Sequence, residues 1–263
     1  MALPAPSETA TALVTGASSG IGEAIARQLA SRGHGLTLVA RREDRLRELA
    51  SDVAGKHGVR AEVISADLGD PTARERLAGQ IAEMGLEVEI LVNNAGFGGT
   101  GDRSRLVSMV ELNCVALLDL QERYLRPMVD RGRGAVINVA STAAFQPLPG
   151  TATYAATKAF VLSLSEAAHE ELKGTGVTMT AVCPGPVKTE FMAVAGIEAA
   201  EEQVPGLFWM SADDVAKAAI EAAEKGKRAI VPGLLNRAGA ITGQHTPRTL
   251  VLPLAKRVWR QAV

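Results

Sequence analysis

Short apolar runs rich in β-branched residues alternate along this chain with longer segments of helical period. This alternation predicts a parallel sheet covered by helices on both faces, and several runs are continuous apolar strings, as strands buried on both sides require. The expected strands are 12–14, 36–40, 61–65, 90–92, 135–140, 177–183 and 229–231. The expected crossover helices are 21–32, 45–55, 72–84, 107–130, 154–172 and 212–225.

The 263 residues are expected to form one α/β domain, because no internal repeat, low-complexity tract or linker divides the chain. We expect a disordered lead-in over 1–9, the domain over 10–233 and a C-terminal extension over 234–263. Two segments break the alternation. They are the long connection 191–210 and the extension itself, which ends in an apolar and basic stretch.

Composition argues against several classes of function. Lys plus Arg number 28 and Asp plus Glu number 29, so the net charge of −1 leaves no basic excess for binding a nucleic acid. Cys114 and Cys183 lie in apolar stretches without metal-ligand spacing, which predicts buried thiols in a reducing compartment and no metal site. No leader sequence and no run of about 18 apolar residues occurs, so we expect a cytoplasmic protein without stable membrane insertion.

A glycine-rich turn follows the first expected strand. Residues 15–22 are TGASSGIG, and glycines at this spacing let the backbone turn tightly and approach a pyrophosphate at the N-terminus of the next helix. The same residues satisfy G-x-S-x-G, the nucleophile elbow of α/β-hydrolases, with His245 as the candidate base. The esterase interpretation is disfavoured, because too little chain precedes the turn to supply an oxyanion loop.

The end of the second expected strand indicates which dinucleotide binds. An acidic residue there would hydrogen-bond the adenosine ribose, whereas an arginine accepts a 2′-phosphate. Ala40 occupies the place of the acid and Arg41 follows it, which favours NADPH over NADH. The alternative interpretation is that Arg41, Arg42 and Arg45 form a solvated helix start, where cations gain nothing from the helix dipole.

Tyr154 and Lys158 are four residues apart, and therefore on one face of the helix expected over 154–172. A cation beside a phenol favours the phenolate, and such a tyrosine can exchange a proton with a carbonyl oxygen. Alone, a Tyr-x-x-x-Lys pair is more often a surface pair. Here the chain has only two tyrosines, and Ser141 lies 13 residues before Tyr154, directly after an expected strand.

Together these motifs resemble the classical short-chain dehydrogenases/reductases. TGASSGIG resembles the family's TGxxxGxG turn, NNAG at 93–96 its NNAG motif, Ser141 with YAATK at 154–158 its catalytic set, and PGPVKT at 184–189 the segment that holds the nicotinamide. The motifs follow the family's order over roughly residues 10–233. The resemblance implies a Rossmann-type, doubly wound, seven-stranded parallel sheet in a single domain. It also implies an NADP(H)-dependent oxidoreductase acting on a carbonyl or secondary alcohol.

By this resemblance the catalytic set is Asn113, Ser141, Tyr154 and Lys158. Tyr154 would be the general acid in reduction, Lys158 would bind the nicotinamide ribose and lower the phenol pKa, and Ser141 would hydrogen-bond the substrate oxygen. Asn113 would kink its helix and anchor a water molecule. The cofactor would lie against Gly16, Ser18, Ser19, Gly20, Ile21, Gly22, Arg41, Asp67, Leu68, Asn94, Ala95, Gly96, Tyr154, Lys158, Pro184, Gly185, Val187 and Thr189.

Two segments bear on the substrate. The 17 positions from Gly96 to Asn113 are a few short for the family, so we expect a trimmed loop from Phe97 and a more open substrate side. The connection at about 190–210 corresponds to the family's variable lid, and its apolar residues predict an apolar or bulky substrate, or else packing on the core. These residues are Phe191, Met192, Val194, Ile197, Val204, Leu207, Phe208, Trp209 and Met210.

The stretch 250–260 is amphipathic and basic, which suits a membrane surface or a neighbouring subunit. The protein contact is favoured, because one short helix binds membranes weakly. The family commonly forms dimers or tetramers through the helices expected over 107–130 and 154–172, so the resemblance implies a homodimer or homotetramer.

Two functions remain at this point. One is the oxidoreductase, and the other is a non-catalytic NADP(H)-binding redox sensor of the same fold. A sensor has no use for Ser141, Tyr154 and Lys158 together, so their joint presence favours the enzyme.

Overall fold

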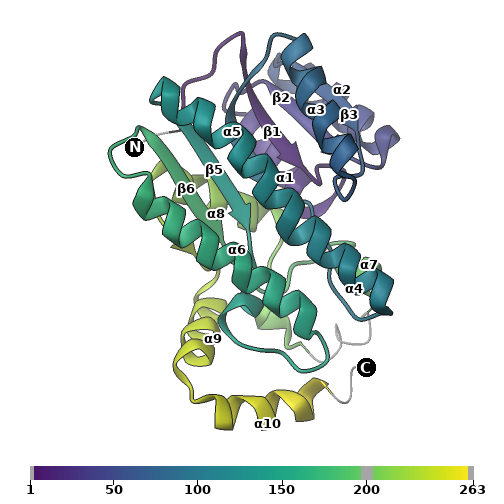
Figure 1. Ribbon diagram of the computed structural model, residues 1–263, viewed down its shortest axis with the longest axis vertical. Helices are drawn as coiled ribbons and strands as arrows, with labels where there is room; N and C mark the ends of the chain where they lie inside the picture. Colours follow the sequence, from purple (N-terminus) through teal and green to yellow (C-terminus); the bar gives the residue numbers. More distant parts are fainter. Residues whose placement is uncertain (1–2, 197–203, 260–263) are drawn as a thin grey trace.

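The apolar runs form one sheet with the strand order β3-β2-β1-β4-β5-β6-β7, and every neighbouring pair is parallel. This computed structural model describes residues 3–196 and 204–259 (Figure 1). The strands are β1 Ala10–Thr15, β2 Leu36–Ala40, β3 Ala61–Ser65, β4 Glu87–Asn93, β5 Gly134–Val139, β6 Val177–Val182 and β7 Ala229–Ile230. The predicted seven-stranded, doubly wound Rossmann-type sheet is confirmed.

Helices connect the strands and cover both faces of the sheet. The α-helices are α1 Gly20–Ala30, α2 Glu43–His57, α3 Pro71–Glu83, α4 Arg103–Val110, α5 Leu117–Arg131, α6 Ala152–Glu171, α7 Phe191–Ala195, α8 Ala212–Glu224, α9 Leu234–His245 and α10 Arg248–Trp259. A π-helical segment η1 (Glu111–Ala116) joins α4 to α5, and short 3₁₀ turns are η2 (Thr142–Phe145) and η4 (Gly206–Phe208).

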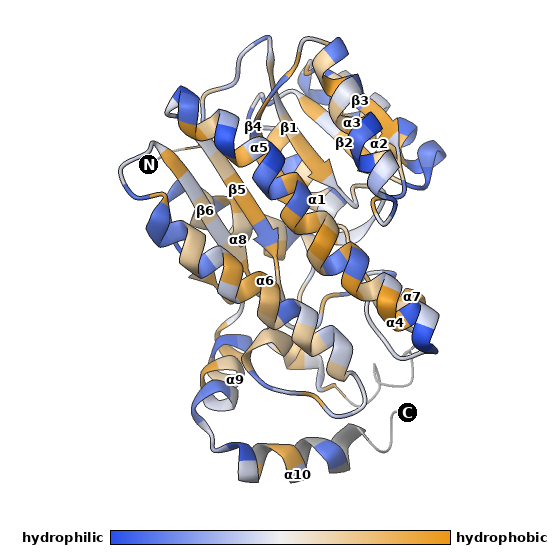
Figure 2. Ribbon diagram, in the orientation of Figure 1, coloured by the Kyte–Doolittle hydropathy of each residue, from blue (hydrophilic) through white to orange (hydrophobic). Residues whose placement is uncertain are grey.

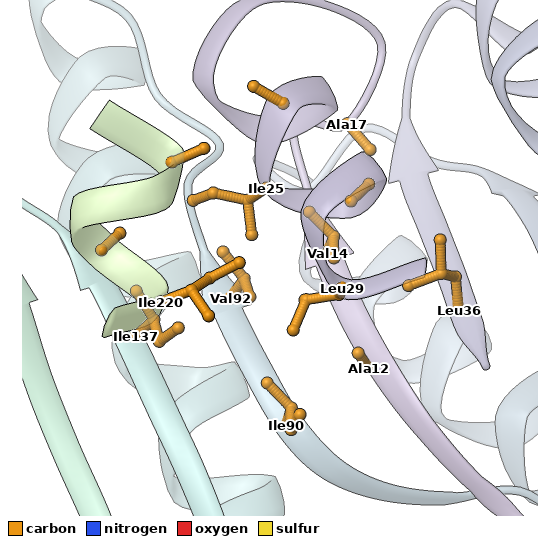
Figure 3. Close-up of a cluster of buried hydrophobic side chains, with 14 of the residues drawn as sticks. Ala12, Val14, Ala17, Ile25, Leu29, Leu36, Ile90, Val92, Ile137 and Ile220 are labelled. Atoms are coloured by element: carbon orange, nitrogen blue, oxygen red, sulfur yellow. The ribbon is translucent and has the colours of Figure 1, made fainter. Parts of the chain in front are cut away.

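The core lies on both faces of the sheet, because successive residues of a strand point to opposite sides. In β1, Val14 packs with apolar residues of α1, α2 and α8, whereas its neighbour Leu13 packs with those of α3, α5 and α6. Figure 3 shows the first of these clusters, in which Ile25 and Leu29 meet the sheet beside Ile220. In Figure 2 the central strands are largely hydrophobic, whereas the covering helices carry both hydrophobic and hydrophilic residues. The continuous apolar strings in the sequence thus have the two-sided burial expected of them.

The strand order reverses between β1 and β4, whose chain connections leave the sheet in opposite directions. In open α/β sheets such a switch point creates a crevice at the carboxyl ends of the strands, where ligands bind. The loops after β1, β4 and β5 all begin at this edge, so the fold itself places the glycine-rich turn, the NNAG segment and Ser141 together.

One expectation about helices was wrong, and one further helix was not predicted. The helix expected over 107–130 is three elements, because a π-helical segment at 111–116 interrupts it. The extension after 234 contains the additional helix α9, whose glycines concealed its helical pattern and which packs against η2.

The helix α10 lies apart from the sheet and its flanking helices (Figure 1), with Leu250 and Leu252 exposed. The amphipathic stretch predicted over 250–260 ends outside the described residues, as does Ile197 of the predicted lid. Within the described part of the chain, no helix is both long enough and apolar enough to cross a membrane.

Candidate active site

A cavity of about 700 Å³ lies at the carboxyl ends of the strands, lined by residues that follow β1 to β6. All of the predicted cofactor-binding residues line it except Gly22, and so do three of the four predicted catalytic residues. Gly22 and Asn113 lie behind the lining. A Cβ at Gly22 would collide with the Asn94 side chain, so this glycine is required for packing of α1 rather than for contact with a ligand.

The glycine-rich turn leaves the start of α1 open to the cavity. Gly16 and Gly20 have φ values of 65° and 60°, in the left-handed region that favours glycine. Ser19 occupies the N-cap position of α1 without a side-chain cap, so the first N–H groups of the helix have no such acceptor. An anion in the cavity would meet these donors together with the positive end of the helix dipole.

Thr15 fixes this turn to the NNAG segment. Its hydroxyl donates to the Val92 carbonyl over 3.1 Å and accepts from the backbone N–H groups of Asn94 and Ala95, each over 3.0 Å. The Asn94 amide in turn donates to the carbonyls of Thr15 and Gly16. Sequence analysis quoted Thr15 as part of the motif but assigned it no role. It holds the two motif segments in register.

The adenosine end of the cavity contains two arginines. Arg41 lines it as predicted, but Arg42, considered beforehand only as part of a solvated helix start, makes the contacts with the turn. Its guanidinium donates to the hydroxyls of Ser18 and Ser19 over 3.1 and 2.7 Å, and pairs with Glu190 over 2.7 Å. This guanidinium also holds the pKa of the Glu190 carboxyl below its usual range. The unusual signal in the sequence was cations at the start of a helix, where the dipole disfavours them.

The opposite wall of the adenosine end is formed by Asp67 and Leu68, which follow β3. The Asp67 carboxylate accepts from the Gly69 N–H over 3.0 Å. The Leu68 carbonyl accepts from Arg74 over 2.7 Å, and that buried guanidinium also pairs with Asp119 over 2.6 Å. Arg74, which sequence analysis missed, therefore holds the wall in place.

These features fit a dinucleotide. The close glycine turn, the uncapped start of α1 and the arginines at the end of β2 supply backbone donors and positive charge for phosphates at two places. The volume and the two-ended shape of the lining leave room for a nicotinamide beside Ser141 and Tyr154.

Tyr154 and Lys158 lie on α6, one turn apart, and face Ser141 at the end of β5. Burial raises the pKa of Tyr154 to about 12, and a hydrogen bond with the Ser141 side chain acts in the opposite direction. The Lys158 ammonium donates to the Val139 carbonyl over 2.8 Å and stands 5.8 Å from the centre of the Tyr154 ring. Burial lowers the pKa of Lys158 to about 8.

In this structure burial has the largest effect on the pKa of Tyr154, and the predicted lowering of that pKa by Lys158 with cofactor bound stays a prediction. A phenol with a pKa near 12 is protonated at neutral pH, which suits it to give a proton to a developing alkoxide.

Asn113 occupies the π-helical segment η1, where its helix departs from α geometry as the kink expectation requires. Its side-chain amide accepts from the Phe97 N–H over 3.1 Å and donates to the Phe97 carbonyl over 2.9 Å. It also donates to the Thr157 hydroxyl over 3.1 Å, next to Lys158 on α6. Asn113 thus joins the short loop after β4 to the catalytic helix.

The substrate half of the cavity, as we call the part beyond Ser141 and Tyr154, has walls of three kinds: the segment after β5, the lid around α7 and η4, and α9. The Phe191 ring lies 5.6 Å from the Tyr154 ring, and Gly98 permits this approach because a Cβ there would meet both rings. The substrate half is lined by Gly99, Thr142, Ala143, Gln146, Leu148, Thr151, Phe191, Met192, Val194, Val204, Phe208, Asn236, Gly239 and Ala240.

Five of the predicted lid residues therefore face the cavity, but Leu207 is 65% exposed and Trp209 donates to the Val204 carbonyl. The contribution of α9 was not predicted. Its inward face presents Asn236 and Ala240, and Asn236 donates to the Phe208 carbonyl over 3.0 Å, which ties the extension to the lid.

Comparison with known proteins identifies the family of the chain. A family model described as short chain dehydrogenase matches residues 10–199. Sulfoacetaldehyde reductase 2 of Chromohalobacter salexigens is 36% identical over 69% of this chain and 74% of that protein. Very-long-chain 3-oxoacyl-CoA reductase of Anas platyrhynchos is 33% identical over 72% of this chain, but the match spans only 64% of that longer protein. A short-chain dehydrogenase from Sphingobium yanoikuyae, solved in complex with NADPH, superposes with a TM-score of 0.79 at 33% identity over 96% of both chains.

Proposed function

This chain belongs to the short-chain dehydrogenase family of oxidoreductases, and from that premise we propose that it transfers hydride between NADP(H) and a carbonyl or secondary alcohol. The observation that carries the proposal is the grouping of Ser141, Tyr154 and Lys158 at one end of a cavity whose other end is built for phosphates. The substrate we propose is apolar or bulky.

The preference for NADP(H) is supported by the arginines at the end of β2. Arg41 lines the cavity, and Arg42 already contacts two hydroxyls of the turn, so a 2′-phosphate there would meet two guanidinium groups. No acidic residue follows β2 at the position that would bind a ribose hydroxyl. The related Sphingobium enzyme was solved with NADPH.

When bound, the cofactor supplies the hydride, and the protein supplies position, hydrogen bonds and a proton. Ser141 would donate to the substrate oxygen as negative charge develops on it, an oxyanion role. Tyr154, protonated at neutral pH, would give its proton to that oxygen in reduction and take it back in oxidation.

Lys158 would hold the nicotinamide ribose and stabilise the phenolate that forms when Tyr154 gives up its proton. Because its pKa of about 8 lies below that of Tyr154, the Lys158 ammonium would return a proton to the phenolate favourably. Asn113, which we expect to anchor a water behind Lys158, would connect this lysine to solvent for proton resupply.

Assembly is proposed as a homodimer or homotetramer through α4, η1, α5 and α6. Support comes from apolar side chains that these helices leave exposed, among them Val107 at 56%, Val115 at 42% and Phe160 at 39%. Apolar surface of this kind on neighbouring helices commonly becomes buried between subunits.

The test is NADPH consumption against ketones and aldehydes of graded size and polarity, with Tyr154→Phe beside the wild type. We expect apolar ketones to be reduced, and we expect Tyr154→Phe to bind NADPH with unchanged affinity while losing more than about 99% of turnover, in line with loss of the general acid. Substantial turnover by the variant would disprove the acid–base assignment. Tight NADPH binding by a wild type that reduces no compound would favour the redox sensor instead.

A further inference from the structure

The two halves of the cavity differ in charge. None of the described residues that line the substrate half is ionisable. Apolar side chains such as Phe191, Val194 and Phe208 predominate, and the polar ones that accompany them are neutral.

The charged residues that line the cavity are Arg41, Arg42, Asp67, Lys158 and Glu190, which lie at the cofactor end or beside Tyr154. Arg42 pairs with Glu190 and contacts the turn, while Lys158 donates to the Val139 carbonyl. Arg105, a basic residue in the first turn of α4, does not line the cavity. Its guanidinium donates to the carbonyls of Thr100 and Val194 and lies over the Phe97 ring.

A carboxylate or sulfonate bound in the substrate half would therefore lose its hydration without gaining a cation. Burial of an unpaired ion is strongly unfavourable, whereas a neutral apolar molecule gains from the same surroundings. The substrate half discriminates by charge as well as by polarity.

Gln146 is the longest of the four neutral polar side chains that line the substrate half, the others being Thr142, Thr151 and Asn236, and we take it as the candidate to bind a substrate group away from the reacting carbonyl. Asn236 already donates to the Phe208 carbonyl, and the Thr151 hydroxyl is closed off from solvent. Gln146 lines the cavity, and its amide makes no hydrogen bond with another residue in the described part of the chain. It lies against Gly243 of α9, where an added Cβ would stand 2.6 Å from the amide oxygen.

We propose that the substrate half selects uncharged molecules: an apolar ketone or secondary alcohol that carries a second, neutral oxygen, which the Gln146 amide recognises by hydrogen bonding. This inference rests on the proposed function. It adds that the substrate is uncharged, and it names the residue that would hydrogen-bond the substrate's second polar group. Carboxylates and sulfonates that must sit inside the cavity are excluded.

The charge class is tested with 4-benzoylbutanoate and its methyl ester, which share the reacting ketone and differ in charge. For the wild type we expect kcat/KM for the ester to exceed that for the acid by more than about 100-fold, because the pocket offers the carboxylate no partner. Gln146→Arg adds a cation and is expected to narrow this ratio at least about tenfold. Gln146→Met, a neutral side chain of similar length, is expected to keep the preference for the ester.

The hydrogen bond is tested with 4-phenylbutan-2-one and 4-(4-hydroxyphenyl)butan-2-one, which differ by one hydroxyl. We expect the hydroxyl to raise kcat/KM about 3- to 10-fold in the wild type and Gln146→Ala to abolish that advantage, while the plain ketone is reduced at a similar rate. Gly243→Ala displaces the Gln146 amide and should have the same effect. Gly79→Ala, in the interior of α3, with no atom within 4 Å of the new Cβ and outside the cavity lining, is the matched control and should retain the wild-type ratio.

The outcomes separate the two proposals. Reduction of the acid at least as efficiently as the ester, in a reaction that Tyr154→Phe abolishes, would overturn the inference while leaving the proposed function intact. A hydroxyl advantage that survives both Gln146→Ala and Gly243→Ala would remove Gln146 from recognition. If no neutral ketone is reduced at all, the charge assignment falls together with the proposed function.

Discussion

The buried Lys158 gives a pH dependence of stability that can be worked out from the structure. Lys158 is 6% exposed and its pKa falls from the ordinary 10.5 to about 8, mainly through burial. At about 1.4 kcal/mol for each tenfold change in the ionisation constant, this fall corresponds to roughly 3 kcal/mol of destabilisation whenever the folded protein must carry the charge. The charged form of this lysine therefore destabilises the fold.

Whether stability rises or falls with pH depends on whether the folded or the unfolded protein binds more protons. Below pH 8 the lysine is charged in both states, so the full cost is present. Between pH 8 and 10.5 the unfolded chain keeps the proton that the folded protein has lost, so stability contributed by this group rises with pH. Lys158→Met removes the cost, and we expect the variant to be more stable than the wild type by about 3 kcal/mol at pH 7, less about 1 kcal/mol for the lost hydrogen bond to Val139.

The assay is urea unfolding of the cofactor-free protein at pH 7, 8.5 and 10. We expect the advantage of Lys158→Met over the wild type to shrink by about 2 kcal/mol between pH 7 and 10. Comparison of the two proteins cancels the contributions of cysteines and tyrosines that both retain. Lys225→Met removes an exposed lysine and serves as the control. A gap that stays constant from pH 7 to 10 would refute the argument, because a buried charge must then contribute nothing.

Three further perturbations follow from the contacts at the cofactor end and from the extension. Arg42→Ala should weaken NADPH binding about 10- to 100-fold and NADH binding far less, and Arg41→Ala should have an effect in the same direction. Fluorescence titration measures both affinities. Equal losses for the two cofactors would show that these arginines do not contact the 2′-phosphate. Arg74→Met should destabilise the protein by about 3 kcal/mol, with the exposed Arg76→Met as the control. It should also weaken the binding of NADPH more than the binding of reduced nicotinamide mononucleotide, which lacks adenosine. Equal losses of affinity for the two ligands would leave Arg74 a purely structural role. Deletion of 252–263 should change substrate use or assembly, seen by steady-state kinetics and light scattering, while circular dichroism keeps the native spectrum; a change in neither property would mean that the segment serves neither.

Sequence patterns located the strands well, because most strand residues are apolar and the central strands are buried on both faces. Leu36–Ala40 and the edge strand Ala61–Ser65 have the predicted bounds. β4 extends three residues before the expected 90–92, since Glu87 and Val88 pair with β1 ahead of a register shift that skips the charged Glu89. Polar residues at the start of a strand carry no hydrophobic signal, so periodicity shortens such strands.

The helix errors have local causes. A π-helical turn changes the hydrogen-bond pattern of one segment without disturbing the apolar period, so the interruption around Asn113 cannot be read from hydrophobicity. In α9, Gly239 and Gly243 lower the helical propensity, yet Gly243 is where the helix approaches Gln146 closely. The residue that concealed the helix is the one its packing requires.

The site residues that belong to a motif could be predicted from the sequence, whereas those positioned only by packing between elements could not. The turn, the NNAG segment and the residues of α6 have spacings that the backbone dictates, so their positions at the cavity follow from the sequence. Arg42 contacts Ser19, Arg74 pairs with Asp119 and Gln146 lies against Gly243, each pair 23 or more positions apart, and no spacing encodes such contacts.

The region matched by the family model, 10–199, ends before η4 and α9, which form much of the substrate half. Similarity over that region therefore bears on most of the sheet, on the cofactor end and on Tyr154. It says little about residues such as Phe208 or Asn236, which line the substrate half. Because function is determined by the site rather than by the fold, two chains can share the reaction and differ in the charge they accept. The neutral lining of this substrate half, rather than the names of its relatives, is the physical basis for choosing which ketones to try.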